Sequence, residues 1–356
     1  MLLDDVSTPV ILAPLAGGPS TPELTAGVAE TGALAFLAAG YLSAEALAER
    51  MAATRRLTVR PFAVNLFVPG RPSDARAVER YARVLAHEAR RMVAPLGSPR
   101  FDDDDWPAKL DLLTRDPVPV VSFTFGCPPE DAIARLHGVG SEVWVTVTSP
   151  DEAGRAEAAG CDVLVVQGLE AGGHRGSWED GDDDHPGGFG LLGLLQLLRA
   201  GTELPLVATG GIATGAAIAA VLALGARAAA LGTAFLRCPE AGTSDVHRRA
   251  LEGDAGTALT RAFTGRTARG IRNRFLDEYS GQAPSAYPEV HHLTAPLRQA
   301  GRQRQEGDVV NLWAGQAYPL VHDRPAGDLV RDLTAELEEA LDGVTARIGR
   351  MQSRRG

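Results

Sequence analysis

The feature that most constrains the fold of this chain is a series of eight short apolar runs separated by segments with a helical pattern. The runs are almost continuously hydrophobic, which is typical of parallel strands that are covered on both faces. Eight alternating β and α units favour a closed α/β barrel, the (β/α)8 TIM barrel, over an open doubly wound sheet, which usually has fewer strands. The predicted strands are residues 10–13, 33–38, 62–67, 120–125, 143–147, 163–167, 206–209 and 228–232.

Most intervals between the predicted strands fit a helix, but the interval after the third strand is longer than a barrel requires. We interpret residues of about 71–117 as an insertion, with one helix near 73–93 and another near 109–113. The clearest single helices between strands are predicted at residues 21–31, 43–54, 151–159, 190–200 and 214–224.

The pattern changes after Phe235, where short helices mix with loops that contain proline and glycine. We therefore divide the chain into a barrel at 1–237, an accessory helical subdomain at 238–307 and a C-terminal segment at 308–356. In the last segment, residues 328–351 have apolar side chains at spacings of three and four, which predicts an amphipathic helix. We expect this helix to pack back on the barrel, with packing on a partner subunit of a homo-oligomer as the alternative.

The formal net charge of −10 at pH 7 disfavours nucleic acid or an anionic membrane as the main partner, so we expect a small-molecule substrate. The three cysteines form no C-x-x-C pair and the N-terminus lacks a signal-peptide pattern, which favours a cytoplasmic protein with reduced thiols. The longest apolar stretch, 216–236, contains Gly225 and Arg227 and fits a helix followed by a strand better than a membrane span. The single lysine, Lys109, has a polar context, which disfavours Schiff-base and P-loop chemistry.

Three charged runs and one histidine pair have no clear place in a catalytic site. The acidic runs 102–105 and 179–184 are expected to be solvated loops, because neither has ligands spaced for one metal geometry. The basic run 266–274 is interpreted as a surface patch, or as a site for a phosphorylated nicotinamide or a carrier thioester. The pair His291-His292 lacks further ligands, so we predict no metal site.

Two pairs of small residues follow the last two predicted strands, where a (β/α)8 barrel commonly binds phosphate. Gly210-Gly211 leads from the seventh strand into a helix, and Gly232-Thr233 follows the eighth. Glycine lets backbone N–H groups approach an anion closely, and the start of a helix adds a favourable dipole. We predict a phosphate site here, with two ordinary barrel turns as the alternative.

Polar residues at other strand ends suggest a flavin site. Asn65 ends the third predicted strand and Gln167 ends the sixth, and two neutral amides could satisfy the alternating carbonyl and N–H groups of a flavin edge. His174 lies in the following loop after Gly172-Gly173, which fits a tight backbone approach with the imidazole directed at the pocket. We therefore predict that His174 takes part in catalysis or contacts the substrate.

These residues resemble the nitronate monooxygenases, formerly called 2-nitropropane dioxygenases. The most specific string is Gln-Gly-x-Glu-Ala-Gly-Gly-His-x-Gly at 167–176, and the segment 312–316 is similar to a late family element that returns toward the pocket. Weaker similarities, in order along most of the chain, are residues 13–18, 65–67, 208–212 and 231–235.

The resemblance implies an FMN-containing barrel that oxidises alkyl nitronates, and by extension nitroalkanes, with O2 to a carbonyl compound and nitrite. It also implies that His174 is the catalytic base. Leu15, where methionine is often seen, and the acidic insert after the catalytic loop depart from the family pattern. The implied contacts to the flavin ring are Ala13, Pro14, Leu15, Asn65 and Gln167, and those to its phosphate are Gly172, Gly173, Gly210, Gly211, Gly232 and Thr233.

Other functions share parts of this pattern. An NAD(P)H-dependent FMN reductase of enoyl thioesters or quinones would share the Ala-Gly-Gly-His loop, so the motif does not separate it from a monooxygenase. A flavin-free barrel enzyme could use the phosphate site for a phosphorylated sugar. A non-catalytic binding barrel would keep the glycines and would tolerate replacement of His174.

Overall fold

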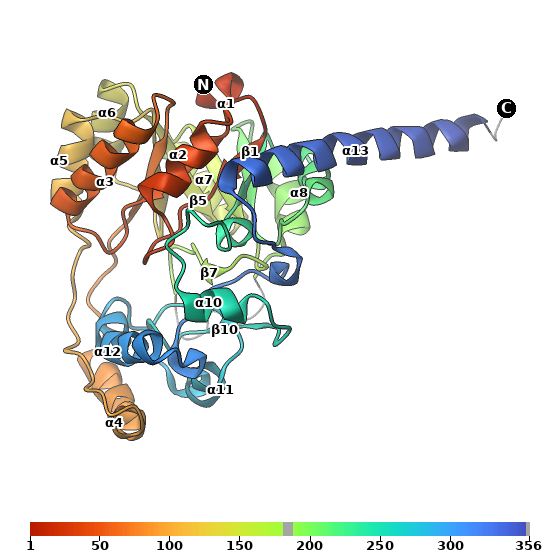
Figure 1. Ribbon diagram of the computed structural model, residues 1–356. Coiled ribbons are helices and arrows are strands. Elements are labelled where there is room, and N and C mark those ends of the chain that lie inside the picture. The colour runs from red at the N-terminus through yellow and green to blue at the C-terminus, as the bar shows by residue number, and fades with distance from the viewer. Residues whose placement is uncertain (181–187, 354–356) are drawn as a thin grey trace.

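The computed structural model describes residues 1–180 and 188–353, and within them eight parallel strands form a closed barrel (Figure 1). Neighbouring strands pair in chain order, and the barrel closes where β1 pairs with β9, with Val10 opposite Ala229. The predicted (β/α)8 fold is confirmed, and no strand end differs from the predicted one by more than one residue. The barrel strands are β1 (Val10–Leu12), β2 (Leu34–Ala38), β3 (Ala63–Phe67), β4 (Val120–Thr124), β5 (Glu142–Val147), β6 (Val163–Gln167), β8 (Leu206–Thr209) and β9 (Ala228–Leu231).

The strands are apolar on both faces because each face is buried against a different layer. One set of side chains, which includes Phe36, Trp144 and Val207, packs inside the barrel together with Leu3 from the N-terminal helix. The alternate set, which includes Leu37 and Val145, packs outward against the surrounding helices. Burial on both sides is the physical reason for the continuous hydrophobic runs.

A ring of helices surrounds the barrel, and several of them begin at a polar cap. The side chains of Thr21, Ser43, Ser149 and Thr214 each accept a hydrogen bond from the backbone N–H three residues later, which satisfies an otherwise unpaired donor. The helices between barrel strands are α2 (Pro22–Ala29), α3 (Ala44–Leu57), α4 (Ala75–Arg91), α5 (Trp106–Arg115), α6 (Glu130–Gly138), α7 (Pro150–Ala158), α8 (Leu191–Gly201) and α9 (Gly215–Ala223).

The insertion differs from the prediction at its second helix. Helix α5 buries Leu110 and Leu113 in the outer barrel core and contacts α3 and α6, so it is the regular barrel helix after β3. Only α4 leaves the barrel, and it packs its buried face, which includes Tyr81, on residues of the accessory subdomain such as Phe275 and Leu293. The two segments therefore share one core, below the barrel in Figure 1.

The accessory subdomain contains a small sheet as well as helices. Strand β11 pairs with β10 on one side and with β7, a two-residue strand of the predicted catalytic loop, on the other. Its elements and the remaining short ones are α1 (Leu2–Asp5), β7 (Gly173–His174), η1 (Thr233–Phe235), α10 (Asp245–Ala250), β10 (Thr257–Thr260), β11 (Ala268–Ile271), α11 (Arg274–Tyr279), η2 (Ser280–Gln282), α12 (Glu289–Arg304), η3 (Gly307–Val309) and η4 (Tyr318–Leu320).

The last helix, α13 (Ala326–Ser353), has two different halves. Its first half buries Val330, Leu333 and Leu337 and contacts α9 and α2, so it completes the helical ring next to β1. Its second half projects away from the body of the protein (Figure 1). The expected packing on the barrel therefore holds for the first half of this helix and not for the second.

Both acidic runs were expected to be solvated, and this is wrong for Asp104 in the first run and for Asp180 in the second. The Asp104 carboxylate lies 2.7 Å from Nζ of Lys109, a side chain that is only 1% exposed. In the second run, Asp180 is buried and forms an ion pair with Arg261, while residues 181–184 lie outside the described part of the chain. These carboxylates fix loops, because buried charges need partners.

Among residues 1–180 and 188–353, no helix has both the length and the apolar character needed to cross a bilayer. Within the same residues, no three His, Cys, Asp or Glu side chains come together in a way that could hold a metal ion.

Candidate active site

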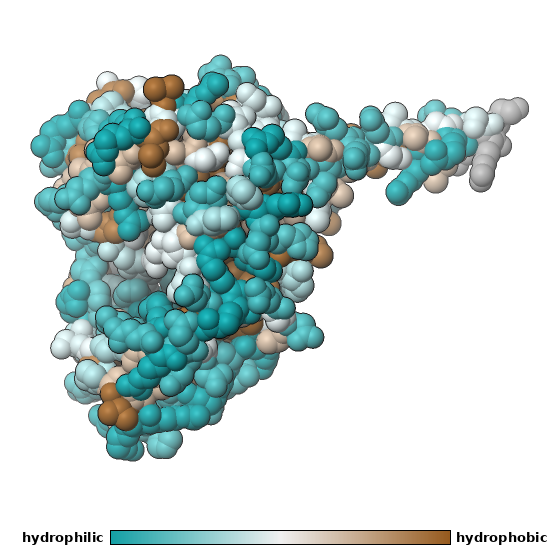
Figure 2. Space-filling view, viewed as in Figure 1, coloured by the Kyte–Doolittle hydropathy of each residue, from teal (hydrophilic) through white to brown (hydrophobic). Residues whose placement is uncertain are grey.

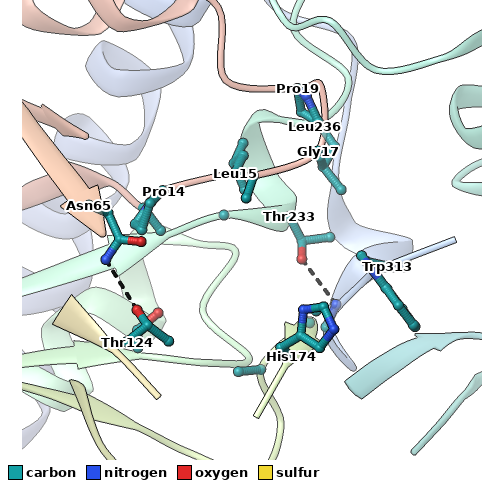
Figure 3. Close-up of a pocket in the computed structure, with 18 of the residues that line it drawn as sticks. Pro14, Leu15, Gly17, Pro19, Asn65, Thr124, His174, Thr233, Leu236 and Trp313 are labelled. Atoms are coloured by element: carbon teal, nitrogen blue, oxygen red, sulfur yellow. Dashed lines mark hydrogen bonds between the residues drawn. The ribbon is translucent and has the colours of Figure 1, made fainter. Parts of the chain in front are cut away.

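A cavity of about 680 Å3 lies at the C-terminal ends of the barrel strands, where catalytic sites of this fold are found. Its size is in the range of small-molecule and cofactor sites. All twelve residues predicted from the sequence line this cavity, and they come from five segments at the ends of barrel strands. They are Ala13, Pro14, Leu15, Asn65, Gln167, Gly172, Gly173, His174, Gly210, Gly211, Gly232 and Thr233. Figure 3 labels Pro14, Leu15, Asn65, His174 and Thr233 among them.

The loop after β6 is held by polar contacts at both ends. The Gln167 side chain donates from Nε2 to the carbonyl of His174 at 3.1 Å and accepts from the N–H of Gly176 at 2.8 Å. The Glu170 carboxylate accepts from the N–H of Leu191 and so caps the start of α8. The polar side chains of Gln167 and Glu170 thus fix the loop, and contact of Gln167 with a flavin stays a prediction.

Glycine is required in this loop for two separate reasons. A Cβ on Gly172 would lie 2.4 Å from the backbone nitrogen of Gly315, so only glycine lets these two backbone segments touch. Gly173 has a φ of +74°, and a Cβ there would meet no atom within 4 Å. The first glycine therefore permits close packing, while the second permits a left-handed turn.

His174 is fixed by the accessory subdomain. Its backbone pairs with Ala268 of β11, and its imidazole Nε2 lies 2.9 Å from Thr264 Oγ1. The Thr264 hydroxyl donates its proton to the carbonyl of Arg266 at 3.3 Å, so toward His174 it accepts a hydrogen bond from Nε2–H. The imidazole then carries its proton on Nε2 and its lone pair on Nδ1. Burial, and next the nearby charge of Arg266, lower the pKa of His174 to about 3, so the imidazole is neutral at neutral pH.

The predicted phosphate site has free backbone donors. The N–H groups of Gly211, Gly232 and Thr233 have no recorded acceptor in the described chain, and Thr233 is the first residue of the short helix η1. The Thr233 hydroxyl accepts from the N–H of Gly315 at 3.0 Å, which ties the two sides of the cavity together (Figure 3). Unpaired N–H groups at a helix start fit a phosphate group.

Asn65 lies on the opposite side of the cavity. Its Nδ2 donates to Ser122 Oγ at 2.9 Å and to Thr124 Oγ1 at 3.1 Å, which leaves its carbonyl oxygen without a recorded partner in the described chain (Figure 3). The orientation of the amide is therefore fixed by β4, and its oxygen remains available to accept from a ligand N–H.

Comparison with known proteins agrees with this geometry. The family model described as nitronate monooxygenase matches residues 2–336. The chain belongs to the nitronate monooxygenase family. A nitronate monooxygenase from Pseudomonas aeruginosa is 40% identical over 349 residues, covering 93% of this chain and 97% of that protein. A nitronate monooxygenase from Paraburkholderia phytofirmans is 38% identical over 352 residues, covering 95% of this chain and 94% of that protein.

Solved structures support the same family. A nitroalkane oxidase from Streptomyces ansochromogenes is 49% identical and has a TM-score of 0.94, covering 96% of this chain and 99% of that one. FabK from Thermotoga maritima, at 23% identity with a TM-score of 0.76, shares the fold. The chain is thus an oxidoreductase of a flavin-dependent family, as the sequence predicted.

Four aromatic rings that were not among the predicted site residues also line the cavity. His291 stacks on Tyr41 with ring centroids 4.3 Å apart, and Trp313 lies 5.6 Å from His174. Phe125 contacts His174 edge to face at 5.6 Å. Tyr41 and Phe125 both have positive φ, at 68° and 77°, and such backbone strain is concentrated at functional sites. Tyr41 had no signal in the sequence, whereas His291 was considered only as a metal ligand and Trp313 lies in the segment 312–316 that was expected to return toward the pocket.

The basic run 266–274 was interpreted as a surface patch, and this is wrong for its first half. Arg266 is 8% exposed and lies over the Phe125 ring at 4.1 Å. Arg269 is 5% exposed and donates from Nε and Nη2 to the carbonyl of Leu169 at 3.0 and 2.9 Å. These arginines hold the loop and wall of the active site.

Arg298 on α12 is a further cavity residue. It is 5% exposed, and its Nη2 and Nε bond to the carbonyl of His291 and to Thr294 Oγ1. No bond of its Nη1 and no carboxylate partner is recorded in the described chain, and Arg302, one turn later, likewise lacks a carboxylate. Burial lowers the pKa of Arg298 to about 10, so the guanidinium stays charged at neutral pH.

Proposed function

We propose that this chain is an FMN-dependent monooxygenase that oxidises alkyl nitronates, and nitroalkanes after removal of their α-proton, with O2 to a carbonyl compound and nitrite. The charge of the cavity carries the proposal. No Asp, Glu or Lys side chain of the described chain lines it, whereas Arg298, Arg302 and the neutral His174 do. A chain of net charge −10 thus has an electropositive cavity, which suits an anionic phosphate and an anionic nitronate.

The cavity fits FMN in its donor groups. The free N–H groups of Gly211, Gly232 and Thr233 would hold the phosphate, and Asn65 would accept from an N–H of the ring. The twelve predicted residues surround one space, so the proposed ring and phosphate sites would be continuous. When bound, FMN supplies the electron acceptor, and the residues of this chain bind and orient the substrate.

His174 and Arg298 have different tasks in this proposal. A neutral nitroalkane must first lose its α-proton, and the neutral imidazole of His174 can accept it. A nitronate has already lost this proton and carries a negative charge, which the free Nη1 of Arg298 would stabilise. The depressed pKa of His174 disfavours the role of a protonated donor, because the imidazole is neutral before it meets the substrate.

The decisive experiment mixes the purified flavin-containing protein anaerobically with an alkyl nitronate and, separately, with NADPH. We expect the nitronate to bleach the flavin absorbance, and admission of O2 to release nitrite. Bleaching by NADPH alone would instead identify a reductase. A colourless protein that takes up no added FMN would refute both flavin functions.

Two variants separate the roles of the side chains. His174→Gln should lose turnover of neutral nitroalkane while it retains most of its turnover of preformed nitronate. Arg298→Met should raise the KM for nitronate by about tenfold or more, as expected for a charge-assisted bond of about 1.5–3 kcal/mol. Unchanged nitroalkane turnover in His174→Gln would remove this histidine from the role of base.

A further inference from the structure

The second half of α13 carries an apolar stripe that nothing in the described chain covers. Leu341, Val344, Ile348 and Met351 are 46%, 51%, 50% and 66% exposed, whereas Leu337, one turn earlier, is 5% exposed. Their spacing of three and four residues places them on one face of the helix. Figure 2 shows this part of the helix standing clear of the body, with hydrophilic and apolar residues both in view.

A helix of this composition is weak on its own. Residues 338–353 extend about 24 Å beyond the last buried leucine, at 1.5 Å per residue. Gly343 and Gly349 lie inside this stretch, and each lowers helix stability by about 1 kcal/mol relative to alanine. Isolated helices of this length are marginal in water. The projecting half therefore needs a partner that covers its apolar face.

The spacing of the stripe points to a second copy of the same helix. The intervals from Leu337 to Met351 are four, three, four and three residues, which is the repeat of a two-helix seam. The series is also nearly symmetric about Val344, since Leu341 and Ile348 lie three and four residues to either side. A two-fold axis at Val344 would therefore place Val344 beside its own copy and Leu341 beside Ile348.

Charge decides the direction of pairing. The segment before the centre carries Glu338, Glu339 and Asp342, and the segment after it carries Arg347 and Arg350. Parallel helices would place acid beside acid and base beside base. Antiparallel helices place each acidic segment along the basic segment of the partner, which is electrostatically favourable.

We propose that the projecting half of α13 pairs antiparallel with the same segment of a second copy of this chain, with the two-fold axis at Val344. The apolar stripe forms the seam, and the acidic and basic segments set the direction. A helix pair about 24 Å long is a small interface, so the dimer dissociates on dilution. The catalytic cavity does not take part, because its lining residues come from other elements.

Cysteine crosslinking tests this register in the full-length flavin-containing protein. Val344→Cys should crosslink with itself under mild oxidation. Leu341→Cys and Ile348→Cys should each remain uncrosslinked alone and should form a mixed crosslink when the two variants are combined. The unmodified chain, with its three cysteines, is the matched control. Self-crosslinking of Leu341→Cys without a mixed product would overturn the antiparallel arrangement.

Sedimentation analysis tests the dimer independently. Leu341→Asp combined with Ile348→Asp should raise the dimer dissociation constant by about tenfold or more, because two charges would enter the seam. Both positions are exposed, so the barrel should fold as before, and unchanged nitronate turnover checks this. A monomer at all concentrations, or a dimer that the double substitution leaves unchanged, would refute the proposal.

Discussion

Replacing Gly172 by alanine tests whether contact between the catalytic loop and the returning C-terminal segment builds the cofactor site. The new Cβ would lie 2.4 Å from the nitrogen of Gly315 and 2.5 Å from the carbonyl carbon of Ala314. Such atoms normally lie about 3.5 Å apart, so one backbone segment must move by about 1 Å. Neither neighbour is a flexible side chain that could turn away.

Two hydrogen bonds depend on that contact. Gly315 N–H donates to Thr233 Oγ1 at 3.0 Å, and Gln316 N–H donates to the carbonyl of Glu170 at 3.0 Å. A displacement of about 1 Å would break either bond, with a loss of about 1 kcal/mol each, in addition to about 1–3 kcal/mol for overpacking. We therefore expect Gly172→Ala to lose about 2–5 kcal/mol in total.

The assay measures flavin affinity by fluorescence titration and stability by thermal unfolding. Gly172→Ala should bind FMN at least about tenfold more weakly, since a loss of 1.4 kcal/mol suffices for that factor. Gly193→Ala is the matched control, because a Cβ on this exposed residue of α8 meets no atom within 4 Å. If Gly172→Ala has the flavin affinity and unfolding temperature of the unmodified chain, the contact does not build the site.

Three further predictions concern stability and loop position. Burial lowers the pKa of His247 from the ordinary 6.5 to about 4, so the free energy of unfolding should fall by about 3 kcal/mol as the pH is lowered from 6.5 to 4. His247→Gln should remove this loss and make stability less sensitive to acid, as urea unfolding at a series of pH values would show. Glu88 is fully buried, and its Oε1 lies 2.6 Å from Nη2 of Arg274. Glu88→Ala should therefore lower the free energy of unfolding by about 3–5 kcal/mol, because it leaves the arginine without its buried partner. Replacing both residues, by Glu88→Leu with Arg274→Met, should recover most of this loss. Arg269→Met removes the two hydrogen bonds to the carbonyl of Leu169 that hold the catalytic loop. It should weaken FMN binding by up to about thirtyfold in the fluorescence titration, with the far-ultraviolet circular dichroism unchanged.

The barrel and the lining of its cavity could be predicted because both leave local traces in the sequence. A strand buried on two faces must be apolar throughout, and a turn that approaches a ligand needs glycine at fixed places. The runs that became the barrel strands, β1 to β6, β8 and β9, show the first effect, and the pairs Gly210-Gly211 and Gly232-Thr233 show the second. Strand order then follows from the chain order, because parallel units are joined by right-handed crossovers.

Contacts made by backbone carbonyls could not be predicted, because a carbonyl acceptor has no sequence signature. Arg269 and Arg266 lie in a run that looks like a solvated basic patch, yet their partners are carbonyls of Leu169 and Ser177. Likewise, the two residues of β7 are too few to show a strand pattern, and their partner β11 lies about ninety residues later. Long-range pairing of this kind appears only in three dimensions.

The same contacts imply that the barrel alone does not make the site. His174 is held by Ala268 and Thr264, and Gly172 rests on Gly315, all from residues beyond the last barrel strand. The first half of α13, which closes the helical ring, comes later still. The segment 236–325 is therefore an excursion within the barrel's own sequence, since the eighth helix follows it. Residues that position the catalytic loop thus lie, in the sequence, between the last barrel strand and the helix that closes the ring.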